Sequence, residues 1–189
     1  MPGKLDGKKG RIAMPRVPSA VTVVTVAGEG EMGGMAIRSF TSVSIDPLLI
    51  SLNVPCEAQT HDLIVGTERF AVHLLSEEQA VLSNHFSALD HRGEEPFAAI
   101  PYRLDLHGTP ILEDVLAVFY CARYAVYEAG DQSLLVGEVL HIEQGVEGRP
   151  LVYFDESYRS VGDEVEAKTF DPVKRSSNET PYAPTPKKA

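Results

Sequence analysis

The segment from Gly33 to Val54 combines a strand-like apolar pattern with an unusual number of hydroxyl groups. Four hydroxyl residues lie between apolar residues in its middle: Ser39, Thr41, Ser42 and Ser44. Hydroxyls, together with free backbone amides at strand ends, donate hydrogen bonds to phosphate or ring-carbonyl oxygens without adding positive charge. The segment therefore predicts a site for a phosphorylated cofactor. The alternative is that the hydroxyls only cover the solvent face of an antiparallel strand.

A second candidate site follows at residues 53–63, "NVPCEAQTHDL". The stretch leads from a strand into the start of a helix, where free amides and the helix dipole favour an anion. Gln59 and Thr60 would add side-chain donors there. The alternative is an ordinary helix that Thr60 caps and Gly66 ends.

The charge of the chain limits its partners. Its formal net charge is −10, with 27 acidic and 17 basic residues. Nucleic acids and anionic lipids are therefore not expected partners, and a bound anion must be held by local donors. No run of about 18 apolar residues is present, so no membrane span is expected. Cys56 and Cys121 show no CxxC spacing and are expected to be reduced thiols in a cytoplasmic protein.

Other familiar chemistries have no motif in this chain. None of the six histidines forms an i,i+4 pair on a helix, and no metal site is predicted. His73 and His141 occur in strand patterns and are expected to be surface residues or hydrogen-bonded sheet residues. No nucleophile elbow, phosphate-binding loop or dinucleotide-binding glycine pattern is found.

The elements that must position these residues are mostly strands. Alternating and β-branched runs predict strands at 20–28, 35–45, 48–54, 70–76, 116–130, 133–145 and 150–162, with the second bent in its middle. Short helices are expected at 60–66 and 76–89, the latter capped by Ser76. This pattern favours a closed or nearly closed antiparallel barrel. Residues 1–13 and 163–189 have the composition of a disordered arm and tail.

Taken in order, these stretches resemble the flavin reductase-like family of FMN-binding split barrels. The most specific combination is "SFTSVSIDP" at 39–47, followed at a distance by "GD" at 130–131 and "VGEV" at 136–139. The resemblance is collinear over residues 14–162, which are identified as an FMN-binding split-barrel domain. It implies a mainly β fold: a six-stranded antiparallel Greek-key split barrel with a few short flanking helices.

The resemblance also implies a homodimer, a cofactor and a set of site residues. The cofactor is FMN, or alternatively FAD, with NADH or NADPH as co-substrate. Flavin would lie along the segment from Ala36 to Val43, with its phosphate near Asn53 to Thr60. The implied cofactor-binding residues are Ala36, Ile37, Arg38, Ser39, Thr41, Ser42, Val43, Asn53, Val54, Gln59 and Thr60, and those on the nicotinamide side are Asp131 and Gln132. No catalytic side chain is implied, because hydride passes directly between stacked rings.

Two residues depart from the family pattern. Arg38 stands where the family commonly has Asn, and its guanidinium would tune or anchor the flavin. Gln132 replaces the His of the family's GDH motif, which is associated with pyridine-nucleotide binding.

Two candidate functions follow from the resemblance and these departures. The first is NAD(P)H-dependent reduction of FMN, with reduced flavin passed to a partner monooxygenase or to ferric iron. The alternative is an FMN-binding electron carrier that takes electrons from another protein.

Overall fold

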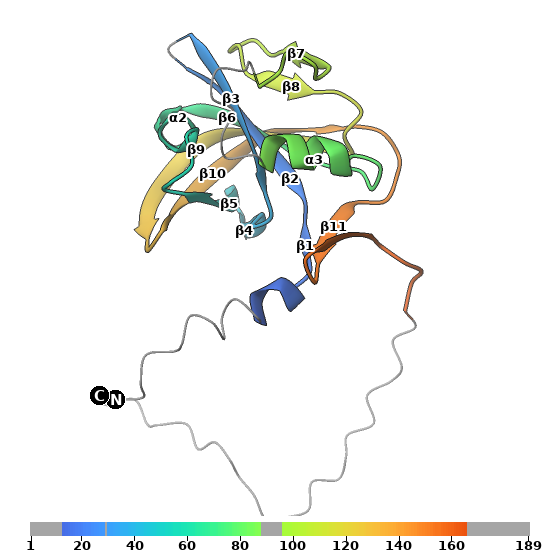
Figure 1. Ribbon diagram of the computed structural model, residues 1–189. Coiled ribbons are helices and arrows are strands. Elements are labelled where there is room, and N and C mark those ends of the chain that lie inside the picture. Colours follow the sequence, from blue (N-terminus) through green and yellow to red (C-terminus); the bar gives the residue numbers. More distant parts are fainter. Residues whose placement is uncertain (1–12, 29, 88–95, 166–189) are drawn as a thin grey trace, which may run out of the picture.

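The computed structural model describes residues 13–28, 30–87 and 96–165 (Figure 1). Its described part is mainly antiparallel β-structure with two short α-helices, as the sequence predicts. Most of the predicted arm and tail lies outside the described residues, so the domain boundaries stay predictions. No helix in the described ranges is long and apolar enough to cross a bilayer.

One seven-stranded antiparallel sheet forms the body of the molecule. Its strand order is β3-β2-β6-β9-β10-β5-β4. The strands are β2 (Thr22–Gly28), β3 (Glu31–Ile37), β4 (Thr41–Ile45), β5 (Leu48–Pro55), β6 (Arg69–Leu74), β9 (Ala117–Ala129) and β10 (Gln132–Gln144). The last two are the long strands predicted around the Gly130–Asp131 turn.

The sheet closes on itself through the bent strand that the sequence predicts. β3 and β4 stand at opposite ends of the strand order, yet only residues 38–40 separate them in the chain. At this bend the backbone N–H of Asn53 donates to Ser39 Oγ (2.7 Å), which ties the bend to β5. With β3 and β4 counted as one strand, the barrel has the six strands predicted. The order β6-β2-β3/β4-β5 is a Greek key.

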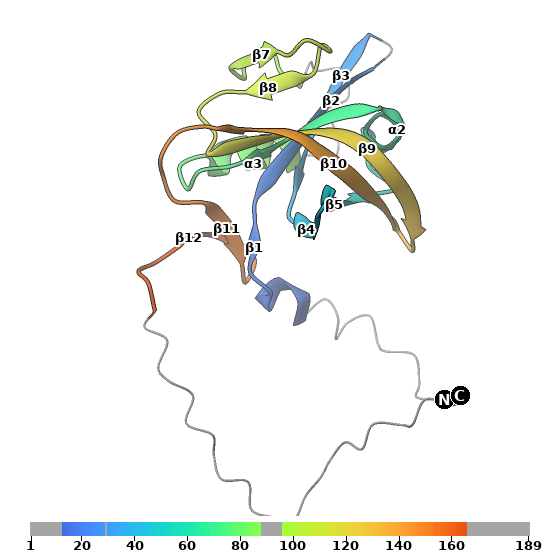
Figure 2. The same cartoon turned by 180° about the vertical axis from the view of Figure 1, so that it is seen from behind.

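Smaller elements cover the outside of this barrel (Figures 1 and 2). β1 (Ser19–Ala20) pairs with β11 (Leu151–Phe154), which pairs with β12 (Ser157–Ser160). We refer to β11 and β12 as the terminal hairpin. β7 (Tyr102–Leu104) and β8 (Pro110–Leu112) form a second hairpin. The helical elements are η1 (Met14–Arg16), α2 (His61–Gly66) and α3 (Ala80–Ser87).

Both predicted helices exist, but the start of α3 differs from the sequence prediction. α3 begins at Ala80, because Ser76 lies in a turn in which its backbone N–H donates to Gln79 Oε1 (2.9 Å). Thr60 precedes α2, yet its side chain makes no capping hydrogen bond. α2 ends at Gly66, as predicted.

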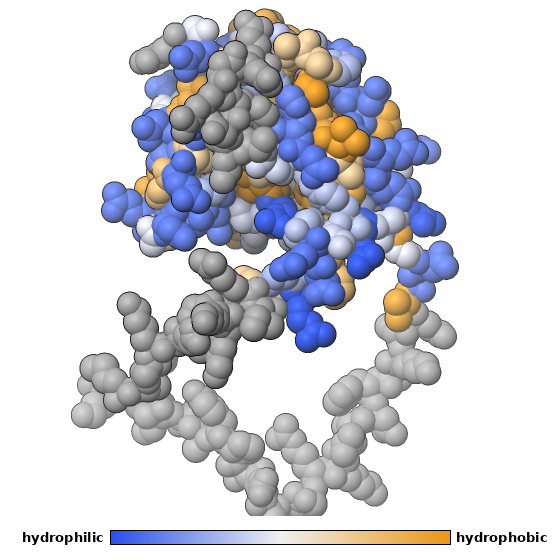
Figure 3. All heavy atoms as spheres, in the orientation of Figure 1, coloured by the Kyte–Doolittle hydropathy of each residue, from blue (hydrophilic) through white to orange (hydrophobic). Residues whose placement is uncertain are grey.

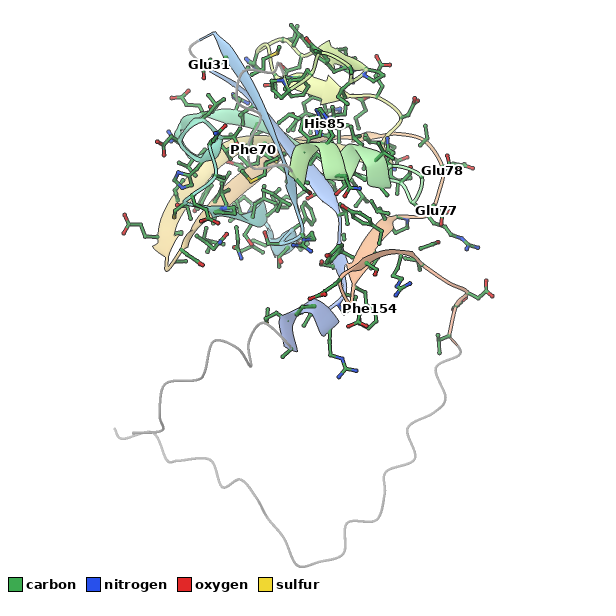
Figure 4. All side chains as sticks on the ribbon, in the orientation of Figure 1. Glu31, Phe70, Glu77, Glu78, His85 and Phe154 are labelled. Atoms are coloured by element: carbon green, nitrogen blue, oxygen red, sulfur yellow. The ribbon has the colours of Figure 1, made fainter. Side chains whose placement is uncertain are left out.

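Apolar residues form two separate cores. The first fills the barrel and includes Leu52, Leu135 and Phe70, which lies among the strands in Figure 4. The second lies between the outer face of the sheet and the covering elements, and includes Val23, Phe86 and other buried residues. α3 and the terminal hairpin are thus held against one side of the barrel, where the outer core packs. The molecular face in Figure 3 is mixed, with hydrophilic residues around scattered apolar ones.

Candidate functional site

A cavity of about 490 Å³ lies on the outside of the barrel at the point where the sheet closes. One wall comes from the ends of β3 and β5, a second from α3, and a third from the terminal hairpin. We refer to it as the closure cavity. Its lining residues are Met35, Ala36, Arg38, Pro55, Ser83, Asn84, Phe86, Ser87, Tyr153, Glu156 and Tyr158.

Two of the predicted flavin residues line this cavity, and the predicted nicotinamide side lies next to it. Ala36 and Arg38 face it directly. Pro55, another lining residue, is the register partner of Gln132 in the pairing of β5 with β10. The Asp131 carbonyl accepts a hydrogen bond from the Cys56 N–H (3.0 Å). The fold therefore brings residues 36–38 and 131–132 to the same side of the barrel.

Ser39 and Asn53 are engaged with each other. Besides accepting from the Asn53 N–H, the Ser39 hydroxyl lies 3.4 Å from the Asn53 carbonyl oxygen. The Asn53 side chain is exposed. Ser39 therefore closes the barrel, whereas the side-chain amide of Asn53 lies at the surface.

The other hydroxyls of the opening segment lie on the surface. Thr41, Ser42 and Val43 are exposed on β4, which has a bulge between Ser42 and Ser44. Ile37 and Val54 point into the barrel, with 3% and 0% of their surface exposed, so only their backbone could contact a cofactor.

Gln59 belongs to a different cavity of about 630 Å³, lined by residues of α2, the β2–β3 turn and β6. Three carboxylate residues line it, Glu31, Asp62 and Glu68, against one arginine, Arg69. This acidic lining makes it a poorer phosphate site than the sequence suggests for Gln59. Thr60 does not line either cavity, but its methyl group faces the Gly33 backbone.

Nine lining residues of the closure cavity were not predicted. Two of them are Met35 and Pro55, and the other seven lie on α3 and the terminal hairpin: Ser83, Asn84, Phe86, Ser87, Tyr153, Glu156 and Tyr158. The two elements are joined at the cavity, because the Tyr158 hydroxyl donates to Asn84 Oδ1 (2.9 Å) and lies 3.0 Å from Ser83 Oγ. The only sequence signal is the pair of tyrosines at 153 and 158, and it does not say which helix they meet.

A hydrogen-bonded histidine lies beside the nicotinamide-side residues. His61 Nε2 is 2.9 Å from Ser133 Oγ, and His61 Nδ1 is 2.8 Å from Asp62 Oδ1. Ser133 is 5% exposed, so it is closed to a bulky substrate. The contact joins the start of α2 to the start of β10 and helps to hold Gln132 in place.

The residues with shifted pKa values in the described part of the chain lie outside the closure cavity. Hydrogen bonds from Arg103 and Tyr120 lower the pKa of Glu143, and this cluster fastens β7 to β9 and β10. Burial raises the pKa of the free thiol of Cys121 to about 12, which keeps it unreactive. No group of three or more potential metal ligands occurs in the described part of the chain.

The lining of the closure cavity suits a flat cofactor with a polar edge. Met35, Pro55 and Phe86 offer apolar surface, and Tyr153 adds an aromatic ring. Asn84 and Arg38 provide donors around that surface, whereas Ser87, whose hydroxyl donates to the Ser83 carbonyl (2.7 Å), can only accept. Its residues do not form a nucleophile–base pair, so the site favours binding and orientation over covalent catalysis.

The family model described as "Flavin reductase like domain" matches residues 14–162. The chain belongs to the flavin reductase-like family. This matched region contains the whole barrel, α3 and the terminal hairpin, so family membership covers every wall of the closure cavity.

Individual relatives agree with this assignment. The chain is 37% identical over 147 residues to the reductase component of 4-hydroxyphenylacetate 3-monooxygenase of Thermus thermophilus, covering 78% of this chain and 91% of that protein. It is 33% identical over 153 residues to the FMN reductase (NADH) of Agrobacterium fabrum, covering 81% and 85%.

A solved relative has the same fold. The NADH:FAD oxidoreductase of Streptomyces globisporus, in complex with NAD and FAD fragments, matches with a TM-score of 0.77 and 30% identity. The match covers 85% of this chain and 96% of that one.

Proposed function

We propose that the protein is an NADH-dependent flavin reductase that supplies reduced flavin to a partner monooxygenase. The observation that carries this proposal is the closure cavity, which is partly apolar and lined by Ala36 and Arg38 within a flavin reductase-like domain. The relatives support the co-substrate and the acceptor, since one is an NADH-dependent FMN reductase and another is a monooxygenase reductase component.

The residues of the chain act by binding and orienting. Ala36 and Pro55 offer apolar surface to the flavin ring, while Asn84 and the exposed Asn53 amide offer polar contacts at its margins. Gln132, beside Pro55, borders the place where nicotinamide would stack. Bound FMN or FAD supplies the acceptor for the hydride of NADH. A side-chain acid or base is not needed for that transfer.

A homodimer is part of the proposal. Exposed apolar side chains occur on β4 (Val43 and Ile45) and on the second half of β9 (Tyr124, Val126 and Tyr127), and β5 and β10 separate these two strands in the sheet order. Ile45 is 81% exposed, and such a group on an end strand favours burial against a second subunit. A second subunit there would also cover the exposed hydroxyls of Thr41 and Ser42.

The second candidate function is an FMN-binding electron carrier with little NADH turnover, and Gln132 is the observation that favours it. An anaerobic absorption spectrum of the purified protein separates the two. Bleaching of the flavin band on addition of NADH, at a catalytic rate, supports the reductase. A flavin band that persists with NADH supports the carrier, and a protein that binds no added FMN or FAD contradicts both.

We expect Gln132→His to lower the KM for NADH by about fivefold, because an imidazole adds a stacking surface that the amide of Gln lacks. Steady-state NADH oxidation with added FMN measures this. Gln144→His, at the opposite end of β10, is the matched control and should leave the KM unchanged. An unchanged KM in Gln132→His would remove Gln132 from the nicotinamide side.

A further inference from the structure

Arg38 and Tyr153 meet at the wall of the closure cavity. The Arg38 guanidinium carbon lies 4.0 Å from the centre of the Tyr153 ring. Arg38 belongs to the bend between β3 and β4, whereas Tyr153 belongs to β11, more than a hundred positions later in the chain. The contact therefore exists only because the terminal hairpin returns to the N-terminal part of the chain, where β11 pairs with β1 (Figure 2).

Stacking leaves the edge of the guanidinium available to a ligand. An arginine that stacks on an aromatic face keeps its N–H groups in the plane of the guanidinium, pointing away from the ring below it. Across residues 13–28, 30–87 and 96–165, no hydrogen bond or ion pair of the Arg38 guanidinium is found, and its side chain is exposed. Arg38 is thus a positioned cation with unused donors in the lining of the cavity.

Tyr153 is itself fixed from two sides. Its backbone pairs with Ser19 of β1, and its ring contacts the Tyr158 ring edge-on, with centroids 5.4 Å apart. Tyr158 in turn is anchored to Asn84 of α3 by its hydroxyl. This chain of contacts gives Arg38 a rigid platform.

The rest of the cavity indicates which kind of negative charge Arg38 would meet. Asn84 and Ser87 come from the C-terminal half of α3, where the helix dipole disfavours anions, and Glu156 adds a carboxylate. A doubly charged phosphate would be repelled by the C-terminal end of α3 and by the Glu156 carboxylate. A single charge spread over a flat ring, between apolar walls and one guanidinium, is accommodated better.

We propose that Tyr153 positions Arg38 as a cationic contact for the flavin ring, so that this protein binds reduced, anionic flavin more tightly than oxidised flavin. This inference rests on the proposed flavin reductase function. Oxidised flavin has a neutral ring and gains little from the guanidinium, whereas the reduced ring carries a negative charge near N1. By linkage, the midpoint potential of bound flavin is then higher than it would be without Arg38.

The test is anaerobic titration of the full-length protein with oxidised and with dithionite-reduced FMN. We expect Arg38→Asn to weaken the binding of reduced FMN about tenfold and that of oxidised FMN less than about twofold. For two electrons, a tenfold difference lowers the midpoint potential by about 30 mV. Arg159→Asn, an exposed arginine of the same hairpin outside the cavity lining, is the matched control and should change neither value.

Tyr153 is tested by its coupling to Arg38. Tyr153→Leu should weaken the binding of reduced FMN about fivefold. Tyr153→Phe keeps the stacking ring, so this variant should bind reduced FMN as tightly as the original protein does. In the Arg38→Asn background, Tyr153→Leu should not weaken the binding of reduced FMN any further. If Tyr153→Leu still weakened this binding about fivefold in that background, Tyr153 would have a structural role, and the proposal that it positions Arg38 would be overturned.

Riboflavin, which lacks the phosphate, separates the two possible sources of negative charge. If Arg38→Asn weakens the binding of reduced riboflavin as much as that of reduced FMN, the result supports contact between Arg38 and the ring. If only the binding of FMN is weakened, Arg38 contacts the phosphate and the proposal is overturned. Equal effects of Arg38→Asn on oxidised and reduced FMN also overturn it, with the proposed function intact. Failure of the unmodified protein to bind FMN in either state overturns the proposed function as well.

Discussion

Acidification from pH 7 to pH 4 is expected to lower the free energy of unfolding by about 3 kcal/mol through His73 alone. The His73 side chain is completely buried, and burial is the largest cause that lowers its pKa from 6.5 to about 4. Arg103 lowers this pKa further, while the hydrogen bond to Val23 and the charge of Glu143 oppose the shift.

The hydrogen bonds of His73 explain why the folded protein keeps it neutral. The backbone N–H of Leu112 donates to Nε2 (3.1 Å), so this nitrogen must be unprotonated. Nδ1 therefore carries the proton and donates to the Val23 carbonyl (3.0 Å). A second proton on Nε2 would face the Leu112 N–H and break the link between β6 and β8. This observation confirms the expectation of a hydrogen-bonded sheet residue.

The direction of the pH effect follows from the two states. Between about pH 6.5 and pH 4 the unfolded chain binds a proton at His73 and the folded protein does not, so stability falls as the pH falls through this window. Urea unfolding at pH 7 and at pH 4 measures the loss. Since other groups also titrate, the informative quantity is the difference from His73→Asn.

That variant should be less stable at pH 7 but should lose less stability on acidification. His107→Asn, at an exposed position, is the control and should retain the original pH dependence. If the His73→Asn variant lost as much stability as the original protein between the two pH values, the neutral state of His73 would not be the cause.

Gly145→Ala is expected to destabilise the fold by about 3 kcal/mol or more, because no space exists for a side chain. A Cβ atom built on Gly145 would lie 1.8 Å from the carbonyl oxygen of Val115. The neighbouring hydrogen bonds keep the two chains at this distance. The Gly145 N–H donates to the Leu116 carbonyl (2.9 Å) and the Val146 N–H donates to the Val115 carbonyl (3.0 Å).

This close approach lies where β10 ends and the chain turns toward the terminal hairpin, so relief of the clash would displace backbone. Thermal or urea unfolding measures the loss of stability. Gly66→Ala at the end of α2 is the matched control, since nothing lies within 4 Å of its added Cβ; it should be neutral or slightly stabilising. Equal stability of the two variants would contradict the steric account.

The sequence alone determined the barrel and the family. Alternation of apolar residues is imposed by the two faces of a strand, so the long strands β9 and β10 could be predicted almost to the residue. The hydroxyl-rich bend was also predictable, and it proved to be the joint at which the sheet closes. The start of α3 was not, because Ser76 is drawn into a turn with Gln79 and a bridge to Pro150 that a local capping rule does not contain.

Tertiary structure decided the composition of the candidate site. Sequence pattern singled out Ser39 and Gln59 equally as cofactor donors, yet Ser39 bonds across the closure of the barrel and Gln59 lines another cavity. Asn84 carried no signal, and the pair of tyrosines at 153 and 158 did not show which element they meet, because each of these side chains contacts a neighbour distant in sequence. Strand periodicity is a local property, so it can be recognised from consecutive residues of the chain. The lining of a cavity between three elements depends on how α3 and the terminal hairpin pack against the barrel through the outer core, and this packing is visible only in the folded structure.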